Sequence, residues 1–424
     1  MTTDLRVLEA SDWDRWFGTL ERAFGGGLTN STEEREVWRS VTECERSVGV
    51  WDGDECVGTA GAYTFGLTVP GGGVVSAAGV TMVSVAATHR RRGILTSMMR
   101  RQLDDVRSWG QPVALLTASE PGIYGRFGYG VGARQLSVEI DTSRVSVRVP
   151  ADGGTDGAEG TGAGVRLRYV AVDDARESIE SVYARLVETR PGMLERRPGW
   201  DRKLLIDPPE GREGASALEC VLARRGEGDD AETVGYVLYR IKPTWGSGAL
   251  PQGTVVVDQV AALDPDTYAT LWRFLAEIDL TSTVSASSLP VDDPIQFLVS
   301  DVRRSHLTVR DSLHVRLVEV GAALAARAYQ APVDLVFEVD DAFCPWNEGR
   351  WRLTGDEKGA SCERTADAAD LSLSVRELAT MYLGDVSPAA LARAGLVREL
   401  RPGALTEASV AFTSPVAPWL PHGF

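Results

Sequence analysis

The chain has 424 residues, of which 43% are hydrophobic and 25% charged, and its formal net charge at pH 7 is -16. This length exceeds what one hydrophobic core usually serves, so we expect two or three domains of a soluble globular protein. The acidic balance argues against a nucleic acid partner and favours cationic ligands such as amines. No apolar run approaches the roughly 18 residues of a membrane span and no signal peptide is recognisable, so we expect a cytoplasmic protein without membrane association.

From the N-terminus, residues 1–148 show strand and helix signals in the order β-α-α-β-β-β-α-β-α-β. Ser31 and Glu34 form a capping box at a helix start, and the Asp52-Gly53 dipeptide predicts a hairpin turn. The other expected elements are strands at 5–10, 79–87 and 112–119, helices at 12–24, 31–41 and from the basic segment 88–102 to about 106, and a glycine-rich turn at 122–130.

Residues 149–165 are Gly-rich, acidic and without apolar periodicity, which predicts a linker. The next unit, 166–304, repeats the order of the first, but the segment DPDTYATL (264–271) stands where the first unit has its basic segment. The last unit, 305–424, has Ala- and Leu-rich helices beside a few strands, which indicates a small α+β domain.

Metal and disulfide chemistry are not indicated. The five cysteines are scattered and form no CxxC pair, which argues against a disulfide framework and a zinc knuckle. The four histidines show no HExxH or facial-triad spacing. We therefore expect reduced cysteines and no bound metal.

The basic segment THRRRGILTSMMRRQ (88–102) directly follows an apolar strand. A strand that passes through a glycine-containing turn into a helix leaves the first NH groups of that helix available to a phosphate. Arginines at this turn add charge-assisted hydrogen bonds, and Gly93 lets a phosphate approach the backbone. The alternative is a solvated basic helix start, which would set three arginines against the helix dipole.

The spacing R-x-x-G-x-L, from Arg90 to Leu95, after a Val-Ser-Val strand end resembles the acetyl-coenzyme A motif of the GNAT acetyltransferases. In that family the strand before the turn bulges and splays, which exposes main-chain groups to the pantetheine arm and an NH group to the oxyanion of the reaction. Leu95 departs from the Gly or Ala of many members. The resemblance implies an acetyl-coenzyme A site formed by Val83, Ser84, Val85, Arg90, Arg91, Gly93, Ile94 and Leu95.

Two tyrosines, Tyr124 and Tyr129, follow in the glycine-rich turn. When an amine attacks a thioester, the departing thiolate needs a proton donor, and a tyrosine hydroxyl can supply the proton. The alternative is that both rings only fill space in the turn, which is the interpretation we prefer for Tyr129.

The segments VSVAATHRRRGIL (83–95) and ASEPGIYGRFGYG (118–130), with the degenerate second copy and the α+β third unit, together resemble the Eis (enhanced intracellular survival) acetyltransferases of actinobacteria. The resemblance spans the whole chain in order and is strongest over 78–132. It implies a fold class of α+β and α/β: tandem GNAT folds, the second one degenerate, and a C-terminal domain like that of sterol carrier proteins. It also implies a homohexamer.

The resemblance carries over the catalytic roles. The general acid falls on Tyr124, with Ser119 lining the acetyl end, and the general base is the carboxylate of the last residue, Phe424. A last dozen residues rich in large apolar side chains favours docking over a frayed end. Because an α-carboxylate is a weak base, it more readily receives the amine proton, directly or through water, than removes it outright.

Substrates implied by the resemblance are small-molecule amines of the aminoglycoside, polyamine or lysine type, with Phe24 and Trp38 as aromatic walls. Two positions that are acidic in members of the family are Gly26 and Gly423 here, so we expect weaker or narrower polyamine acetylation. Two other functions remain open: a lipid- or apolar-ligand-binding protein with a vestigial acetyltransferase domain, and an assembly scaffold. Affinity for coenzyme A distinguishes the first of these from an enzyme.

Overall fold

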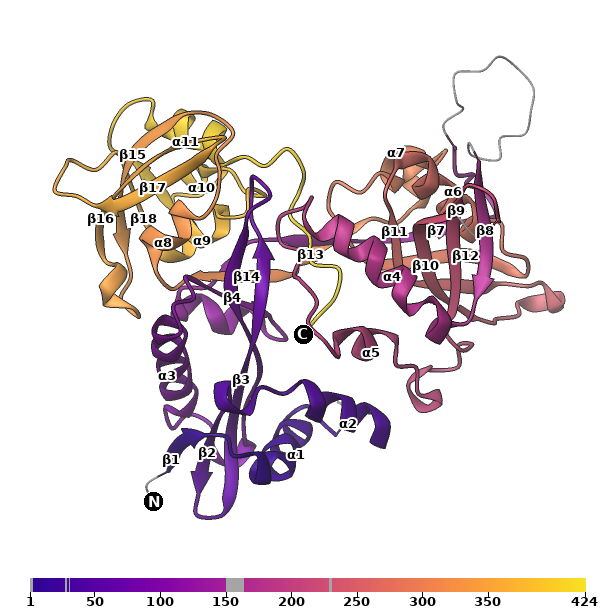
Figure 1. Cartoon of the computed structure of the whole chain (residues 1–424), viewed down its shortest axis with the longest axis horizontal. Coiled ribbons are helices and arrows are strands. Elements are labelled where there is room, and N and C mark those ends of the chain that lie inside the picture. The colour runs from indigo at the N-terminus through magenta and orange to yellow at the C-terminus, as the bar shows by residue number, and fades with distance from the viewer. Residues whose placement is uncertain (1–2, 27–28, 30, 150–163, 229–230) are drawn as a thin grey trace. The chain divides into compact units, whose positions relative to one another are not determined.

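A computed structural model of the chain describes residues 3–26, 29, 31–149, 164–228 and 231–424 (Figure 1). The predicted linker 149–165 thus lies, from 150 to 163, outside the described residues. The chain forms two compact units. Unit 1 comprises Met1–Arg134, Arg190–Lys203 and Asp311–Phe424, and unit 2 comprises Gln135–Thr189 and Leu204–Arg310.

A seven-stranded sheet in the order β1-β2-β3-β4-β5-β14-β6 forms the centre of unit 1. The hairpin predicted at Asp52-Gly53 is confirmed, with Gly53 at a φ of 60° between β2 and β3. β4 runs parallel to β5, and β14 runs antiparallel to both β5 and β6. The strands are β1 Asp4–Val7, β2 Val48–Asp52, β3 Glu55–Thr68, β4 Val74–Val85, β5 Val113–Thr117, β6 Gly130–Val131 and β14 Leu313–Leu317.

Helices cover both faces of this sheet. On one face, Trp16 and Phe17 of α1 (Trp13–Ala23) belong to the same apolar cluster as Ala77 of β4. On the other face, the neighbouring residue Ala78 packs with α3 (Ile94–Ser108), since successive side chains of a strand point to opposite sides. The helix predicted after Ser31 is confirmed as α2 (Thr32–Val41), and the Ser31 hydroxyl accepts a hydrogen bond from the Glu34 NH at 3.0 Å.

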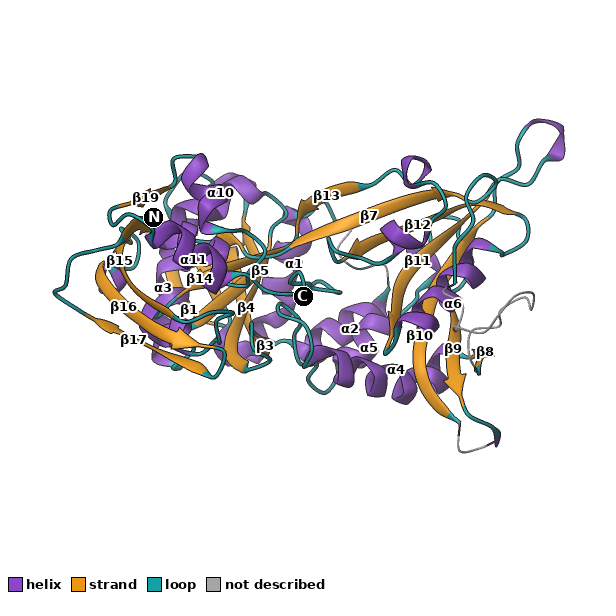
Figure 2. Cartoon of the chain, turned by 90° about the horizontal axis from the view of Figure 1, so that it is seen from above, coloured by secondary structure: helices purple, strands orange, loops and turns teal. Residues whose placement is uncertain are grey.

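A smaller sheet in the order β17-β16-β15-β18-β19 lies in the C-terminal part of unit 1. Helix α11 packs on β15 and helix α10 on β19 (Figure 2). The strands are β15 Val333–Asp340, β16 Gly349–Asp356, β17 Gly359–Arg364, β18 Leu371–Ser374 and β19 Val397–Glu399. The helices are α8 Val320–Ala325, α9 Val375–Met381, α10 Pro388–Arg393 and α11 Ala404–Phe412.

Unit 2 contains a second seven-stranded sheet, in the order β13-β7-β12-β11-β10-β9-β8. Its parallel pair β11 and β12 is joined by α6, which repeats the β4-α3-β5 arrangement of unit 1. The strands are β7 Arg134–Asp141, β8 Val165–Val170, β9 Glu219–Arg225, β10 Glu232–Lys242, β11 Gly253–Ala262, β12 Thr281–Leu289 and β13 Thr308–Asp311. The helices are α4 Val172–Val187, α6 Pro265–Ala276 and α7 Ile295–Leu298, while α5 (Trp200–Leu205) begins in unit 1.

Chain order and sheet membership differ at two strands. β7 follows β6 directly along the chain but pairs with β12 in the second sheet. β14, which comes after all strands of the second sheet, lies between β5 and β6 in the first sheet. Residues 313–317, which we assigned to the third domain from the sequence, therefore complete the first sheet. Within the described residues, no helix is both long and apolar enough to cross a membrane.

Candidate active site

Strand β4 leaves its parallel neighbour part-way along its length. Its register with β5 covers Ala77 to Gly79, whereas its pairing with β3 continues to Val85. A register shift in the β3-β4 pair and a φ of 53° at Met82 mark a bulge. This is the bulged and splayed strand that the GNAT resemblance implies. The Ser84 hydroxyl lies 2.7 Å from the Thr59 hydroxyl, so this side chain already has a partner on β3.

The start of α3 has the geometry of an anion-binding site. Gly93 precedes the helix at a φ of 82°, a left-handed conformation that favours glycine, and no side chain caps the helix. The first helical hydrogen bond runs from Ser97 NH to Gly93 O, so the NH groups of the three residues before Ser97 have no helical acceptor. Nothing lies within 4 Å of the point where a Cβ on Gly93 would stand. This turn therefore has space and donors for a phosphate.

The three consecutive arginines before Gly93 are exposed. In the described part of the chain none of them makes a hydrogen bond or an ion pair, and Arg91 has a φ of 62°. A non-glycine residue in this conformation is uncommon and is often found at ligand sites. The arginines are thus available to a bound anion, and their role at a pyrophosphate stays a prediction.

Tyr124 lies in a 3-10 segment, Pro121–Phe127, that follows β5. Its half-buried ring stands edge-on to Tyr129, with ring centroids 6.0 Å apart. Burial, with a smaller contribution from the Glu120 charge, raises the pKa of Tyr124 above its usual value. The hydroxyl therefore stays protonated at neutral pH, as a proton donor must. Tyr129 is only 1% exposed and packs in the core, and Ser119 is exposed beside the segment.

The end of the chain docks on the open part of β4. The Thr81 hydroxyl donates a hydrogen bond to a main-chain oxygen of Phe424 at 3.1 Å, and Phe424 is 8% exposed. Its ring packs against Phe65 with centroids 5.2 Å apart. A Cβ on Gly79 would lie 3.1 Å from the Phe424 ring and closer still to Phe65. Glycine at position 79 therefore gives the last residue room against the sheet.

The segment Arg190–Lys203 holds the chain end in place. Trp419 NH donates to the Pro191 carbonyl at 2.8 Å, and the Arg190 guanidinium donates to the Ala417 carbonyl at 2.9 Å. A Cβ on Gly192, which has a φ of 88°, would stand 2.9 Å from the Trp419 nitrogen. Main-chain contacts thus fix the tail independently of its own side chains.

An aromatic cluster surrounds the docked tail. Trp200 stands edge-on to Tyr63 and Phe65 and stacks with His422, with ring centroids 5.0, 5.2 and 6.2 Å away. The Lys203 ammonium lies 4.7 Å from the Trp200 ring centre and 4.3 Å from that of Trp38. Trp38, predicted as a substrate wall, therefore belongs to the surroundings of the chain end.

Burial lowers the pKa values of two basic groups in this cluster, Lys203 and His422. Burial lowers the pKa of Lys203 to about 8, against the opposing effect of Glu34, and its ammonium donates to the Gly423 carbonyl at 3.4 Å. Burial and the positive charges of Arg196 and Lys203 hold the pKa of His422 well below its usual value, so this imidazole is neutral at physiological pH.

The second predicted substrate wall, Phe24, lies just after α1 and is 45% exposed. Among the described residues, no ring contact joins it to Trp38 or Phe424. No group of three or more His, Cys, Asp or Glu side chains in the described parts of the chain is arranged to hold a metal ion.

Several residues of this site were missed from sequence. Gly79 offered a signal, because a glycine inside an apolar strand often marks close approach of another group. Thr81 gave no signal, since an alternating strand does not indicate what will bind to it. Trp200 and Lys203 belong to a segment of the central unit in the sequence and join the site only through the tertiary fold.

Known proteins match the whole chain. Two family models described as an acetyltransferase (GNAT) domain match residues 4–132 and 192–317, and a sterol carrier protein domain model matches 320–421. The chain is 63% identical over 424 residues, 100% of both proteins, to an N-acetyltransferase of Streptomyces avermitilis. It is 32% identical over 428 residues, 98% of both proteins, to the N-acetyltransferase Eis of Mycobacterium tuberculosis. The chain belongs to the Eis family of N-acetyltransferases.

The crystal structure of Eis1 from Mycobacterium abscessus is similar over 100% of both chains, with a TM-score of 0.82 at 32% identity. The fold class predicted from sequence, two GNAT-type folds followed by a sterol-carrier-like α+β domain, is therefore confirmed. The Eis-family chain is a GNAT N-acetyltransferase, and the predicted domain boundaries and site residues stay predictions.

Proposed function

We propose that this Eis-family enzyme transfers an acetyl group from acetyl-coenzyme A directly to the amine of a small cationic molecule of the polyamine, aminoglycoside or lysine type. The observation that carries the proposal is the 3.1 Å hydrogen bond from Thr81 to Phe424, which puts an oxygen of the last residue beside the splayed part of β4. An anion at that place can receive an ammonium group close to the main chain that would hold the acetyl donor.

The residues along β4 and at the start of α3 fit acetyl-coenzyme A. Arg90, Arg91 and the NH groups of Ile94 and Leu95 would bind the pyrophosphate, and Gly93 leaves space for it. The remaining members of the set lie along the pantetheine arm and at the acetyl end: Val83, Ser84, Val85 and Ser119. When bound, acetyl-coenzyme A supplies the thioester carbonyl that the amine attacks.

The chain's own residues then move protons and hold charge. The Phe424 carboxylate faces the ammonium and accepts its proton, directly or through water, which leaves a nucleophilic amine. An NH group of the Val83–Val85 stretch donates to the carbonyl oxygen as negative charge develops there. The Tyr124 hydroxyl protonates the thiolate as the C–S bond breaks and the C–N bond forms. The ammonium loses two protons in all: one is released to solvent by way of the Phe424 carboxylate, and the other balances the proton that Tyr124 gives to the thiol.

The surroundings of the chain end indicate a narrower substrate range than a wide acidic pocket would give. Glycine stands at positions 26 and 423, and the Lys203 ammonium occupies the space between Trp38 and Trp200. A second positive charge on a substrate would therefore meet Lys203 near Trp38. We expect monoamines and diamines to be acetylated faster than highly charged aminoglycosides.

The proposal is tested by measuring acetylation of aminoglycosides, polyamines and lysine peptides by the wild-type protein. The same panel is run with Tyr124→Phe and with a variant extended by one residue beyond Phe424. Activity that is no greater in the wild type than in both variants would contradict the proposal. Calorimetric titration with coenzyme A checks the cofactor site separately, and sedimentation equilibrium checks the homohexamer that we also propose.

A further inference from the structure

The glycine-rich turn that carries Tyr124, residues 121–131 (the Tyr124 turn), packs against β14 and the sterol-carrier-like domain. A Cβ on Gly128 would lie 2.7 Å from the Arg316 guanidinium carbon, and a Cβ on Gly130 would lie 2.2 Å from the main-chain oxygen of Arg376 in α9. A Cβ on Gly125 would lie 3.0 Å from the Arg376 guanidinium carbon. Gly128 and Gly130 are thus required by close neighbours that lie almost 200 residues or more further along the chain, and Gly125 lies against a side chain from the same distant region.

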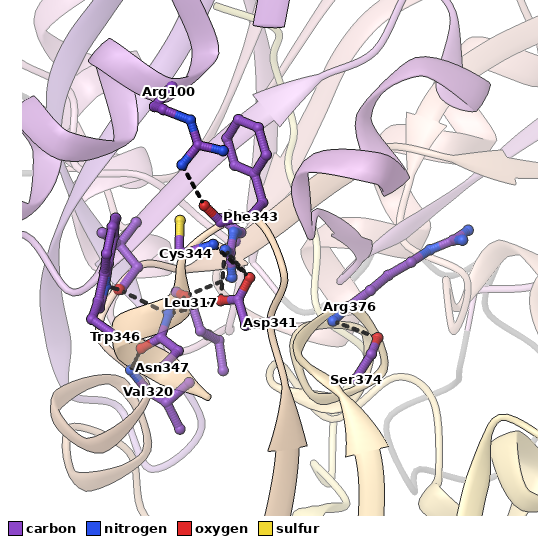
Figure 3. Close-up of polar contacts among 12 residues, drawn as sticks. Arg100, Leu317, Val320, Asp341, Phe343, Cys344, Trp346, Asn347, Ser374 and Arg376 are labelled. Atoms are coloured by element: carbon purple, nitrogen blue, oxygen red, sulfur yellow. Dashed lines mark hydrogen bonds and ion pairs between the residues drawn. The ribbon is translucent and has the colours of Figure 1, made fainter. Parts of the chain in front are cut away.

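Arg316 cannot move aside easily. It is 0% exposed, and its guanidinium donates two hydrogen bonds to the Asp341 carboxylate at 2.7 and 2.8 Å. Asp341 also accepts from the Cys344 NH and from the Asn347 side-chain amide, each at 3.0 Å (Figure 3). A buried ion pair with this many hydrogen bonds is costly to open, because either charge would be left without a partner. Arg316 is therefore held in a fixed position against Gly128.

The loop that contains Asp341, Cys344 and Asn347 also contacts α3. Arg100 donates to the Phe343 carbonyl at 2.9 Å and places its guanidinium 4.3 Å from the centre of the Phe343 ring (Figure 3). The Phe343 ring in turn packs edge-on against Phe127 of the Tyr124 turn, with centroids 5.0 Å apart. The turn is thus held between α9, β14 and the loop that follows Asp341.

The Tyr129 ring connects Gly128, which lies against Arg316, to Tyr124. Tyr129 follows Gly128 directly, is almost fully buried, and stands edge-on to Tyr124. A shift of the backbone at Gly128 or Gly130 would therefore carry the Tyr129 ring, and Tyr124 with it.

We infer that Arg316, fixed by Asp341, and helix α9 are positioning elements for Tyr124, so that the sterol-carrier-like domain helps to orient the group that protonates the leaving thiolate. The inference rests on the proposed function, in which Tyr124 is the proton donor. It gives the C-terminal third of the chain a second role, besides placing Phe424 against β4.

A graded series of glycine substitutions tests this role. In Gly122→Ala, the matched control in the same turn, the new methyl group meets nothing within 4 Å. In Gly125→Ala it meets only the mobile end of Arg376, and in Gly130→Ala it meets the main chain of α9. We expect kcat to be unchanged in the first, about threefold lower in the second and about 100-fold lower in the third, with the KM for acetyl-coenzyme A within about twofold throughout.

A double variant separates positioning from general damage. If Gly130→Ala acts through Tyr124, then combining it with Tyr124→Phe lowers kcat no further than Tyr124→Phe alone. Additive losses in the double variant, or a folded Gly130→Ala protein with wild-type kcat, would overturn the inference. If Tyr124→Phe itself keeps wild-type kcat, it is the proposed proton donor that fails.

A measurement that needs no activity covers the case in which Gly130→Ala does not fold. Arg376 is exposed, so Arg376→Ala should fold, and it removes the guanidinium that covers Gly125. Hydrogen exchange of the peptide spanning the Tyr124 turn should become faster in Arg376→Ala and stay unchanged in Gly122→Ala. Equal exchange in the two variants would show that α9 does not hold the turn.

Discussion

The β4-α3-β5 crossover of unit 1 and the β11-α6-β12 crossover of unit 2 share one backbone plan but differ at the helix start. In both, the parallel pairing stops before the first strand ends, after Gly79 in β4 and after Val257 in β11. A splayed strand alone therefore does not distinguish the two. In unit 1 the connection runs through three arginines to a helix start without a side-chain cap at Gly93.

The corresponding helix start in unit 2 is filled by the chain itself. Asp264 accepts hydrogen bonds from the Thr267 NH at 3.0 Å, the Thr267 hydroxyl at 2.8 Å and the Arg225 guanidinium at 3.0 Å. Burial alone would raise the pKa of Asp264, but these hydrogen bonds outweigh it and hold the pKa below its usual value. Pro265 also removes one NH group from the first turn. A carboxylate thus occupies the place that a phosphate would need.

The comparison shows what a GNAT fold requires beyond its sheet. Unit 2 keeps the strand, helix and strand, yet an acidic cap and a proline fill the helix start that is open in unit 1. If the proposed cofactor site is correct, function depends on a few residues at this turn, and exchanging or removing those residues tests it.

The largest effect should come from Tyr124, the proposed proton donor, which belongs to unit 1. Tyr124→Phe should lower kcat by about 100-fold, because the thiolate would leave without its general acid. The matched control is Tyr268→Phe in α6 of unit 2, whose hydroxyl donates to Asp293. Steady-state kinetics should show no change of kcat in the control, and equal losses in both variants would mean that unit 2 takes part in the chemistry.

A smaller effect is expected when the acidic cap of unit 2 is copied into unit 1. Gly93→Asp should raise the KM for acetyl-coenzyme A by about 30-fold, since a carboxylate at the start of α3 would repel the pyrophosphate. Gly93→Asn is the control of equal size, and asparagine tolerates the left-handed conformation comparably. The two variants should therefore differ in KM by about tenfold, and an equal KM would show that charge at this turn is unimportant.

The reverse change in unit 2 should affect stability but not binding. Asp264→Ala removes the cap of α6 and should lower the free energy of unfolding by about 1 kcal/mol, as measured by urea denaturation. Because Pro265 remains, calorimetry should still detect a single coenzyme A site per chain. A second site in this variant would show that Asp264 alone keeps the nucleotide out of unit 2.

The last effect, similar in size to that of Asp264→Ala, concerns Lys203, which ends the segment Arg190–Lys203 of unit 1. Its pKa is about 8 in the folded protein and about 10.5 in an unfolded chain, so between these values the unfolded chain binds one more proton. Stability should therefore rise with pH from about 8 to about 10.5, by something on the order of 1 kcal/mol. Denaturation at pH 7.5 and pH 10 should show this rise in the wild type relative to Lys203→Met, and parallel curves would contradict it.

Helix starts and turns could be predicted from the sequence. The helix after Ser31, the hairpin at Asp52-Gly53 and the uncapped helix start at Gly93 follow from residue types at fixed short spacings, because capping and positive φ angles are local properties. Docking of the chain end was also predicted, from the apolar side chains near Phe424.

Partners that are distant in sequence could not be predicted in the same way. Strand periodicity gave the segments that became β7 and β14 but not the sheet that each would join, since alternation fixes which face is buried and not which strand lies alongside. For the same reason the sequence did not show that Arg316 would lie beneath Gly128, or that Lys203 would lie between Trp38 and Trp200.

By itself, therefore, the sequence determined the open helix start at Gly93, the glycines of the Tyr124 turn and an apolar chain end, all of which depend on residues close together in the chain. Only the tertiary structure brought Phe424 to Thr81, across 343 positions, and set Arg316 and Asp341 beneath the Tyr124 turn. These contacts depend on burying apolar area over the whole of unit 1, a collective property that no short stretch of sequence specifies.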